Sequence, residues 1–296
     1  MVCDDNMNTS IEGLTILVTG ATSGIGLAST EALAKAGAFV IGVGRDSGRN
    51  ENAKRSILSK IPEAKIEYLL ADLASQAQVR KLSQEVKALL GKFGKESLDA
   101  VVNNAGIYLE NKNYSEDGIE KTFAVNHLAP FMLTHELLDL LQNSKQPRVL
   151  TVTSYSHRTT PIILSRLTDP WPYIGLLAYK RSKLCNVLFT YELNRRMEGK
   201  LLAFAVDPGL VNTSIASKGS DGISDLVWRF RRNQGTSPEV PARTIVYLSG
   251  PGQMDTSEGY YYKNCSPVAP SNLSRNQHLA GELWKLSCEL ANVDWC

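Results

Sequence analysis

A glycine-rich turn near the start of the chain constrains its fold more than any other feature. The segment Thr19-Gly20-Ala21-Thr22-Ser23-Gly24-Ile25-Gly26 lies between an apolar run, 14–18, and a helical pattern that begins near Ile25. Glycine has no Cβ, so the backbone can turn tightly here and approach a pyrophosphate closely. The free N–H groups and the positive dipole end of the following helix then face the anion. The pattern therefore predicts a phosphate-binding turn between a strand and a helix.

The rest of the chain alternates short apolar runs with longer helical periodicity, which is typical of βαβ units and a parallel sheet. We expect an α/β fold: a single Rossmann-like domain over 12–296, with a parallel sheet of about seven strands and helices on both faces. A polar, glycine-containing segment at about 212–237 is interpreted as a lid. The predicted strands are 14–19, 38–43, 65–70, 98–102, 148–153, 201–206 and 260–262. The predicted helices are 25–36, 47–60, 75–90, 118–141 with a kink at Pro130, a helix carrying Tyr179 and Lys183, 239–249 and 275–291.

Composition and charge exclude several classes of protein. Hydrophobic residues make up 43% of the 296 residues and charged residues 21%, which excludes extensive disorder. The net charge of +2 gives no reason to expect nucleic acid as a partner. Residues 1–11 are polar and predict a flexible N-terminal segment. No stretch approaches about 18 consecutive apolar residues, so we expect no transmembrane segment.

The cysteines predict a reducing compartment. They are five in number, widely scattered and without a C-x-x-C pair, which argues against a disulfide framework or a zinc site. We therefore expect a cytoplasmic protein with no metal. His127 and His157 have no metal-ligating company in the sequence and are interpreted as structural residues.

Polar residues and glycines follow the predicted strands at their carboxyl ends, where open α/β sheets bind ligands. In chain order they are Thr19-Gly20-x-x-x-Gly24-x-Gly26, Asn103-Asn104-Ala105-Gly106, Asn126, Ser154, Tyr179-x-x-x-Lys183 and Pro208-Gly209. Together these motifs resemble the short-chain dehydrogenase/reductase family over about residues 12–291. The resemblance implies an oxidoreductase that transfers a hydride between a nicotinamide dinucleotide and an alcohol or carbonyl.

The resemblance assigns catalysis to Asn126, Ser154, Tyr179 and Lys183. Tyr179 and Lys183 are four residues apart, so they share one face of a helix. Free tyrosine titrates near pH 10, so a general acid/base at neutral pH needs its pKa lowered by about 3 units, or about 4 kcal/mol. Lys183 and an oxidised nicotinamide both supply the positive charge. Ser154 would bind the substrate oxygen and Asn126 would help hold a water that relays a proton to Lys183, although each is also compatible with a local structural role.

The resemblance also implies a set of cofactor-binding residues. Asp72 is equally compatible with capping a helix, and Asp207 with capping a turn. The implied set is Thr19, Gly20, Thr22, Ser23, Gly24, Ile25, Gly26, Arg45, Asp72, Leu73, Asn103, Ala105, Gly106, Tyr179, Lys183, Pro208, Gly209, Val211 and Thr213.

Cofactor preference is read at the end of the second predicted strand. An acidic residue there binds the ribose 2′-OH of NAD(H), whereas a basic residue accepts the 2′-phosphate of NADP(H). Here Gly44 takes the acidic position and Arg45 follows it. We therefore expect NADP(H), although Asp46, one residue later, keeps NAD(H) open.

Within the family the chain resembles the retinol-dehydrogenase-like branch, and most closely the group that includes the dehydrogenase/reductase member on chromosome X and its plant relatives. The residues that indicate this are Val206-Asp207-Pro208-Gly209-Leu210-Val211-Asn212-Thr213, with Leu283-Trp284-x-x-Ser287-Cys288 near the end. A lipophilic substrate is implied, retinoid-, prenol- or steroid-like. Homo-oligomers are common in the family, so a homo-oligomer stays open.

Three further features leave alternatives. In the predicted lid, Leu226, Trp228 and Phe230 next to arginines suit a cover for a lipophilic substrate, a peripheral membrane contact, or simple packing onto the core. Cys185, two residues after Lys183, makes this helix similar to that of light-dependent protochlorophyllide reductases, although a buried cysteine is equally compatible with core packing. From another class, a non-catalytic dinucleotide-binding sensor or scaffold remains an alternative.

Overall fold

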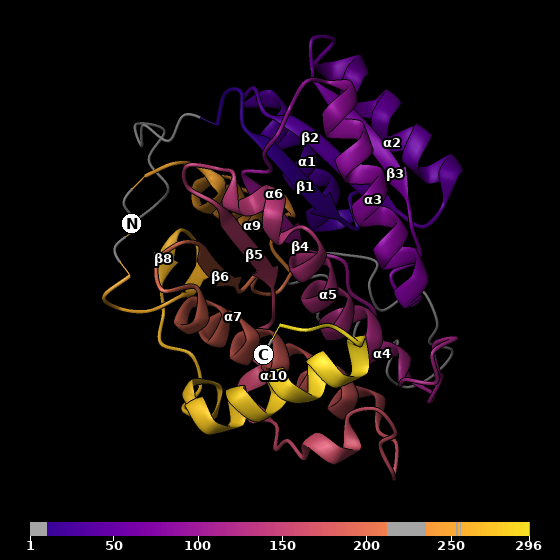
Figure 1. Ribbon diagram of the computed structural model, residues 1–296, viewed down its shortest axis with the longest axis vertical. Coiled ribbons are helices and arrows are strands. Elements are labelled where there is room, and N and C mark those ends of the chain that lie inside the picture. The colour runs from indigo at the N-terminus through magenta and orange to yellow at the C-terminus, as the bar shows by residue number, and fades with distance from the viewer. Residues whose placement is uncertain (1–10, 212–234, 253, 255, 296) are drawn as a thin grey trace.

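Buried apolar runs form the strands of one sheet in the computed structural model, which describes residues 11–211, 235–252, 254 and 256–295 (Figure 1). The order along the sheet is β3-β2-β1-β4-β5-β6-β7-β8, parallel throughout except that β7 and β8 are antiparallel. The predicted sheet is confirmed; the strand that sequence analysis missed is the two-residue β8. The strands are β1 (Thr15–Thr19), β2 (Phe39–Gly44), β3 (Ile66–Leu70), β4 (Ala100–Asn103), β5 (Arg148–Val152), β6 (Leu202–Val206), β7 (Tyr261–Lys263) and β8 (Ser266–Pro267).

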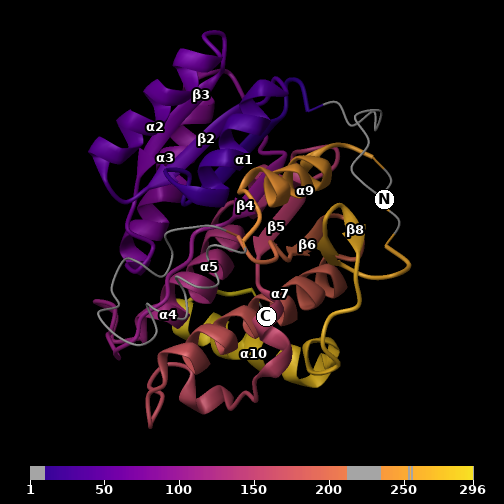
Figure 2. The same ribbon diagram turned by 180° about the vertical axis from the view of Figure 1, so that it is seen from behind.

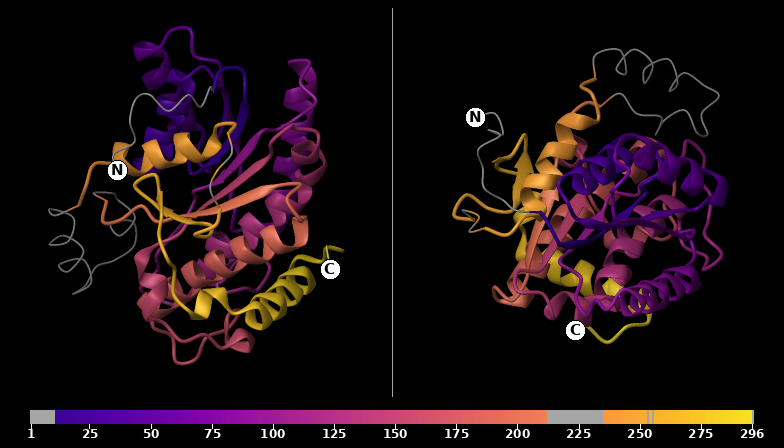
Figure 3. Two further views of the ribbon diagram at one scale, coloured as in Figure 1. Left: turned by 90° about the vertical axis from the view of Figure 1, so that its left-hand side faces the viewer. Right: turned by 90° about the horizontal axis from the view of Figure 1, so that it is seen from above.

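Helices cover both faces of the sheet. On one face, α1 (Gly24–Lys35), α2 (Ser47–Lys60) and α9 (Glu239–Ser249) pack on one apolar cluster, and Figure 2 shows α1 and α9 side by side there. On the other face, α3 (Gln76–Lys92), α5 (Ala129–Glu136) and α7 (Gly175–Met197) pack on a second cluster. The last helix, α10 (Gln277–Ala291), lies over α7, so that α7 is enclosed between the sheet and α10 (Figure 3). Alternate residues of β1 enter the two clusters, as expected for a strand buried on both faces.

The long helix predicted over 118–141 is wrong in its details. The chain instead forms a short helical turn α4 (Lys121–Phe123), a π-helical turn (Ala124–Leu128), α5 and a further helix α6 (Leu138–Gln142). The N–H of Ala129 bonds the carbonyl of Ala124, five residues earlier. Pro130 has no N–H to offer the carbonyl of Asn126, four residues before it, so an α-helical turn cannot be completed there. The predicted kink is therefore a local widening of the helix.

Several predicted elements shift by one or two residues, and two helix starts have clear causes. Ser75 caps α3 by accepting from the N–H of Gln78, as the sequence spacing indicates. Asp46 caps α2 by accepting from the N–H of Arg49 at 2.8 Å. Further short helical turns are Tyr155–Thr159, Leu164–Arg166 and Leu273–Arg275.

Two expectations concern residues that the structure describes only in part. The N-terminal segment 1–10 and most of the predicted lid, 212–234, including Leu226, Trp228 and Phe230, lie outside the described residues.

The cysteines depart from expectation at one position, because Cys265 is disulfide-bonded. Cys185 is a free thiol inside the core. None of the helices described here is long and apolar enough to cross a membrane.

A side chain pairs with the backbone of β6 where β7 does not reach. The strand β7 pairs with β6 only at Ala205 and Val206. Earlier along β6, Asn194 from the end of α7 takes the place of a neighbouring strand: its Oδ1 accepts from the N–H of Ala203 at 2.9 Å, and its Nδ2 donates to the carbonyl of Ala203 at 2.8 Å. Asn194 thus satisfies both buried backbone groups of Ala203, as buried polar groups require.

Replacing Asn194 with leucine should destabilise the fold. The variant leaves two buried backbone groups of Ala203 without partners, each costing about 1–3 kcal/mol, so the free energy of unfolding should fall by about 2–6 kcal/mol. Urea unfolding measures the change. The exposed Asn143, whose amide donates one bond to the carbonyl of Glu96, is the matched control, and Asn143→Leu should cost less than about 1 kcal/mol. Equal effects of the two substitutions would contradict the role of Asn194.

Candidate active site

A cleft of about 940 Å³ opens at the carboxyl ends of the parallel strands. It lies where the strand order reverses: β2 and β3 extend the sheet on one side of β1, and β4 extends it on the other. The loops after these two sets of strands diverge, so the sheet itself leaves the crevice in which open α/β sheets bind ligands. Residues that follow β1 to β6 line it, together with one face of α7.

The glycine-rich turn forms one wall and is held by side chains of β1 and β4. A Cβ on Gly26 would lie 2.2 Å from the carbonyl oxygen of Gly20 and 2.4 Å from Nδ2 of Asn104, so only glycine fits. Asn104 donates to the carbonyl of Thr19 at 2.8 Å, and Thr19 Oγ1 accepts from the N–H groups of Asn104 and Ala105, both at 3.0 Å. The turn is therefore shaped before any ligand binds.

The end of β2 adds two arginines to the same wall. Arg45 and Arg49 both line the cleft, together with Thr22 and Ser23. Asp46 points its carboxylate at the first turn of α2 instead, as the cap described above. Arg49 was missed by sequence analysis; its place four residues after Arg45, in the first turn of a helix that starts at the cleft, was the available signal.

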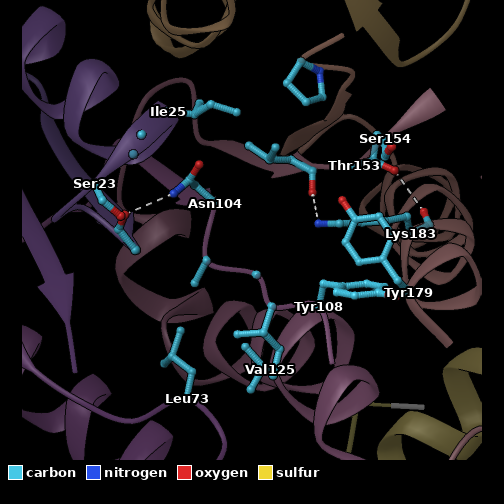
Figure 4. Close-up of a pocket in the computed structure, with 18 of the residues that line it drawn as sticks. Ser23, Ile25, Leu73, Asn104, Tyr108, Val125, Thr153, Ser154, Tyr179 and Lys183 are labelled. Carbon is cyan, nitrogen blue, oxygen red and sulfur yellow. Dashed lines mark hydrogen bonds between the residues drawn. The ribbon is translucent and has the colours of Figure 1, made fainter. Parts of the chain in front are cut away.

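The opposite end of the cleft holds the tyrosine and the lysine. Leu176, Tyr179, Lys180 and Lys183 all line it, because their spacing places them on one face of α7. The Nζ of Lys183 donates to the carbonyl of Val152 at 2.9 Å and lies 5.7 Å from the centroid of the Tyr179 ring. Figure 4 shows these two side chains next to each other, with Ser154 nearby and with Ser23 and Asn104 across the cleft.

Ser154 stands at the end of β5, in a turn that is fixed from behind. Its hydroxyl accepts from the N–H of Ser156 at 3.2 Å, so Ser154 also caps the short helix 155–159. Behind it, His157 Nδ1 lies 2.8 Å from the carbonyl of Ser154, and His157 Nε2 accepts from the N–H of Ser271 at 3.2 Å. His157 therefore donates from Nδ1 and has the structural role expected of it.

Asn126 lies beneath the cleft rather than in its lining. Its Oδ1 accepts from the N–H of Ile107 at 2.8 Å, and its Nδ2 donates to the carbonyl of Ile107 and to Ser182 Oγ, both at 3.0 Å. The side chain thereby fixes the segment after Gly106 against α7. A Cβ on Gly106 would lie 3.4 Å from Lys183 Nζ and 3.5 Å from Asn126 Oδ1, so three elements meet closely here.

Most of the residues predicted to bind a cofactor meet in this cleft. Thr19 and Asn103 do not line it: Thr19 ties two strands together, and Asn103 is buried and donates to Thr134 Oγ1 at 3.3 Å. Asp72 lines the cleft and also accepts from the N–H of Ala74, so both of its predicted roles are compatible with its position. Thr213 lies outside the described residues. The lining residues are Gly20, Thr22, Ser23, Gly24, Ile25, Gly26, Arg45, Asp72, Leu73, Ala105, Gly106, Tyr179, Lys183, Pro208, Gly209 and Val211.

Comparison with known proteins agrees with this arrangement. The model of the short chain dehydrogenase family matches residues 14–223. The chain is 31% identical to mouse retinol dehydrogenase 12, over 99% of this chain and 90% of the relative, and 33% identical to human polyprenol dehydrogenase, over 94% and 84%. A crystal structure of an uncharacterized protein from Mycobacterium paratuberculosis superposes with a TM-score of 0.75 at 30% identity, covering 97% of this chain and 96% of the other.

The chain belongs to the short-chain dehydrogenase family. The named relatives support the retinol-dehydrogenase-like branch that the motifs indicate, and the protein is an oxidoreductase that depends on a nicotinamide dinucleotide. The cleft fits such a cofactor on its own evidence, because a turn that admits only glycine at Gly26 presents the start of α1 to the space where an anion would lie.

Burial shifts the pKa values of two ionisable groups in this dehydrogenase site. It lowers the pKa of Lys183 to about 8 and raises the pKa of Tyr179 to about 12, although the neighbouring Ser154 hydroxyl acts to lower it. Sequence analysis predicted that Lys183 lowers the pKa of Tyr179. The pKa of Tyr179 is instead shifted upward, because burial of the phenol outweighs its hydrogen bond with Ser154.

A comparison of the wild type with Lys183→Met tests the lowered lysine pKa. An ammonium with a pKa of about 8 in the folded chain and about 10.4 in the unfolded chain binds fewer protons in the folded state between those pH values. The free energy of unfolding of the wild type, relative to that of Lys183→Met, should therefore rise by up to about 1.4 kcal/mol per pH unit from about pH 8 to about pH 10, and stay flat below. Urea unfolding across this range measures it. A difference that stays constant throughout would mean that Lys183 titrates as in water.

Proposed function

We propose that the protein interconverts an alcohol and its aldehyde or ketone with NADP(H), and that the substrate is largely lipophilic. The observation that carries the proposal is the meeting of Ser154, Tyr179 and Lys183 at one end of a cleft whose other end presents the glycine-rich turn and two arginines. A hydroxyl, a phenol and an ammonium suit proton transfer at one substrate oxygen.

The chain's residues have separate tasks in this reaction. The bound dinucleotide supplies or accepts the hydride. Ser154 donates a hydrogen bond to the substrate oxygen and orients it, and Tyr179 gives that oxygen a proton in reduction or takes one in oxidation. Lys183 stabilises the Tyr179 phenolate by its charge. Because burial raises the pKa of Tyr179 to about 12, the phenolate forms readily only when further positive charge lies beside it.

Asn126 is suited to a supporting part. Its side chain is fully engaged with Ile107 and Ser182, but its carbonyl lacks the N–H that residue 130 would supply in an ordinary helix, since that residue is Pro130. A carbonyl that lacks this partner is a suitable acceptor for a water that relays protons. The π-helical turn is then part of the machinery, as such turns often are at functional sites.

The preference for NADP(H) rests on charge and on space at the end of β2. Arg45 and Arg49 supply two cations, and Thr22 and Ser23 supply hydroxyls, for a 2′-phosphate. A Cβ on Gly44, the position of the acidic residue in NAD-dependent relatives, would lie 2.1 Å from Asn50 Oδ1 and 2.7 Å from Thr22 Cγ2. A carboxylate residue at this position would therefore have to displace the side chains of Asn50 and Thr22, and Asp46 is engaged as a helix cap.

The substrate class rests on the walls of the open end. Tyr155, Leu176 and Leu210 line it, and each is 43% exposed or more. Exposed apolar side chains that gather at one mouth are typical of a site for an apolar ligand. The retinol and polyprenol named in two relatives are molecules of this kind.

Tyr179→Phe removes only the hydroxyl and tests the proposed activity. NADPH should still bind, and turnover of long-chain apolar aldehydes should fall by about 10²–10⁴ or more, because proton transfer has lost its donor. NADPH fluorescence measures binding, and NADPH oxidation measures turnover. Tyr155→Phe, at the mouth of the same end, is the matched control and should change turnover less than about threefold.

The outcome also separates an enzyme from a non-catalytic sensor or scaffold. Near-normal turnover by a folded Tyr179→Phe variant would remove Tyr179 from the mechanism. A wild-type protein that binds NADPH but reduces no carbonyl compound across aldehydes and ketones of graded chain length would favour the sensor. The pigment-reductase alternative has no support from Cys185, which lies in the core and not in the cleft.

Arg45→Asp tests the cofactor preference. Loss of a charge-assisted bond of about 1.5–3 kcal/mol should reduce NADPH affinity by about ten- to a hundredfold and leave NADH affinity equal or improved. Arg49→Gln should have a smaller effect in the same direction. Arg55, which is on the same helix but pairs with Glu51 outside the cleft, is the control. If the NADPH to NADH affinity ratio is the same in Arg45→Asp as in Arg55→Gln, the assignment is wrong.

A further inference from the structure

We propose that the natural substrate carries an anionic group, a carboxylate or a phosphate, bound by Lys263 and assisted by Lys180, which lines the same cleft. This inference rests on the proposed function and narrows its substrate class from an apolar molecule to an amphipathic one. Both lysines line the cleft, and neither belongs to the motifs that assign catalysis or cofactor binding.

Lys263 is placed at the substrate end by the sheet. It follows Tyr262, which pairs with Val206 at the end of β6, and it shares a face of β7 with Tyr261. The hydroxyl of Tyr261 donates to Asp207 Oδ2 at 2.7 Å, and its ring lies 5.1 Å from that of His157, behind Ser154. That face is therefore the one on which the hydroxyl, the phenol and the ammonium of the proposed reaction stand.

The hairpin that carries Lys263 is anchored to its surroundings. The carbon Cε of Lys263 lies 3.6 Å from where a Cβ of Gly209 would be, at the loop after β6. Directly after it, Asn264 and Cys265 both have positive φ, 50° and 60°, and form the tight two-residue turn into β8. The N–H of Cys265 donates to Thr244 Oγ1 of α9 at 3.1 Å. The lysine therefore stands on an anchored hairpin, which reduces the entropy that a bound ligand would have to order.

Lys180 enters from α7. It is four residues after Leu176, so its ammonium and the exposed Leu176 side chain share the face that carries Tyr179. A ligand held by the Tyr179 hydroxyl can thus contact both the apolar side chain of Leu176 and the ammonium of Lys180.

The charges at this end leave both lysines available. Among the described residues, neither ammonium has a hydrogen bond or an ion pair. The nearby carboxylate of Asp207 accepts from the N–H of Gly209 and from Tyr261. The two described carboxylates that line the cleft, Asp46 and Asp72, follow β2 and β3.

Another cation near the mouth is already engaged. The guanidinium of Arg158 stacks on the rings of Tyr155 and Tyr261, at 5.2 and 5.8 Å, and donates to the carbonyl of Ala269. The substrate end therefore has an excess of positive charge at Lys180 and Lys263, and apolar walls around it. An amphipathic anion complements both features.

The test compares substrates that differ by one charge. We suggest a long-chain aldehyde that ends in a carboxylate, the methyl ester of the same compound, and the same chain ending in a phosphate. The wild type should reduce at least one anionic aldehyde with a kcat/KM about tenfold or more above that of the ester, and the better of the two identifies the group. Lys263→Met should remove about tenfold of this ratio, mainly through KM, and Lys180→Met should remove less.

Two controls keep the outcomes distinct. Lys145→Met removes the same charge from an exposed site before β5, at the far end of the strand, and should leave the ratio unchanged. NADPH affinity, measured by fluorescence, should be unchanged in Lys263→Met; a tenfold loss would assign Lys263 to the cofactor and overturn the inference.

The remaining outcomes separate this inference from the function on which it rests. Equal turnover of charged and neutral aldehydes by the wild type, or an unaltered ratio in Lys263→Met, would refute the anionic substrate and leave the proposed activity standing. If the wild type reduces neither these compounds nor neutral aldehydes of graded length, the proposed activity itself is wrong and the inference falls with it.

Discussion

The hydrogen bonds between Thr19 and Asn104 hold together the two strands on which the site depends. At the switch point, the loops after β1 and β4 lead away in opposite directions, and the crevice between them has no strand to bridge it. Thr19 Oγ1 also donates to the carbonyl of Val102 at 3.3 Å, while it accepts the two N–H groups that follow β4. One hydroxyl thus closes the ends of both strands, and the amide of Asn104 fills the space that a side chain at Gly26 would need.

The two ends of the cleft differ in how far their ionisable groups are exposed to water. The arginines after β2 stand at the surface, where their charge costs little and can attract an anion from a distance. Lys183 and Tyr179 are buried, each under a tenth exposed, and burial disfavours the charged form of both. Burial therefore keeps the Tyr179 phenol protonated at neutral pH, and its phenolate forms readily only when further positive charge lies beside it. Such a site holds its donors in place without stabilising a phenolate prematurely.

The sequence was sufficient for the order of strands and helices and for most of the cleft lining. The buried strands are continuous apolar runs, and the glycines and polar residues stand immediately after them, so position along the chain translates into position in space. The prediction of one helix over 118–141 was wrong for a reason that the hydrophobic periodicity does not reveal. Asn126 is fixed by the backbone of Ile107, and Pro130 removes one donor, so the turn between them opens. The position of Lys263 in the cleft was likewise not predicted, because only the pairing of β7 with β6 brings it beside Gly209. The disulfide at Cys265 was likewise not predicted, because the scattered cysteines have no spacing that indicates a pair.

The Asn194 amide that faces Ala203 also bears on how this protein meets other copies of itself. An unpaired stretch of strand is a template with which a strand of another chain can pair. Because such pairing leads to aggregation, natural proteins protect their exposed strand edges. Along β6, the amide of Asn194 already makes the bonds that an incoming strand would make. The outermost strand at that end, β8, has two residues, one of which is Pro267 and has no N–H to donate. Within the described residues, this end of the sheet thus offers little to an added strand, because one side chain and one imino acid protect it.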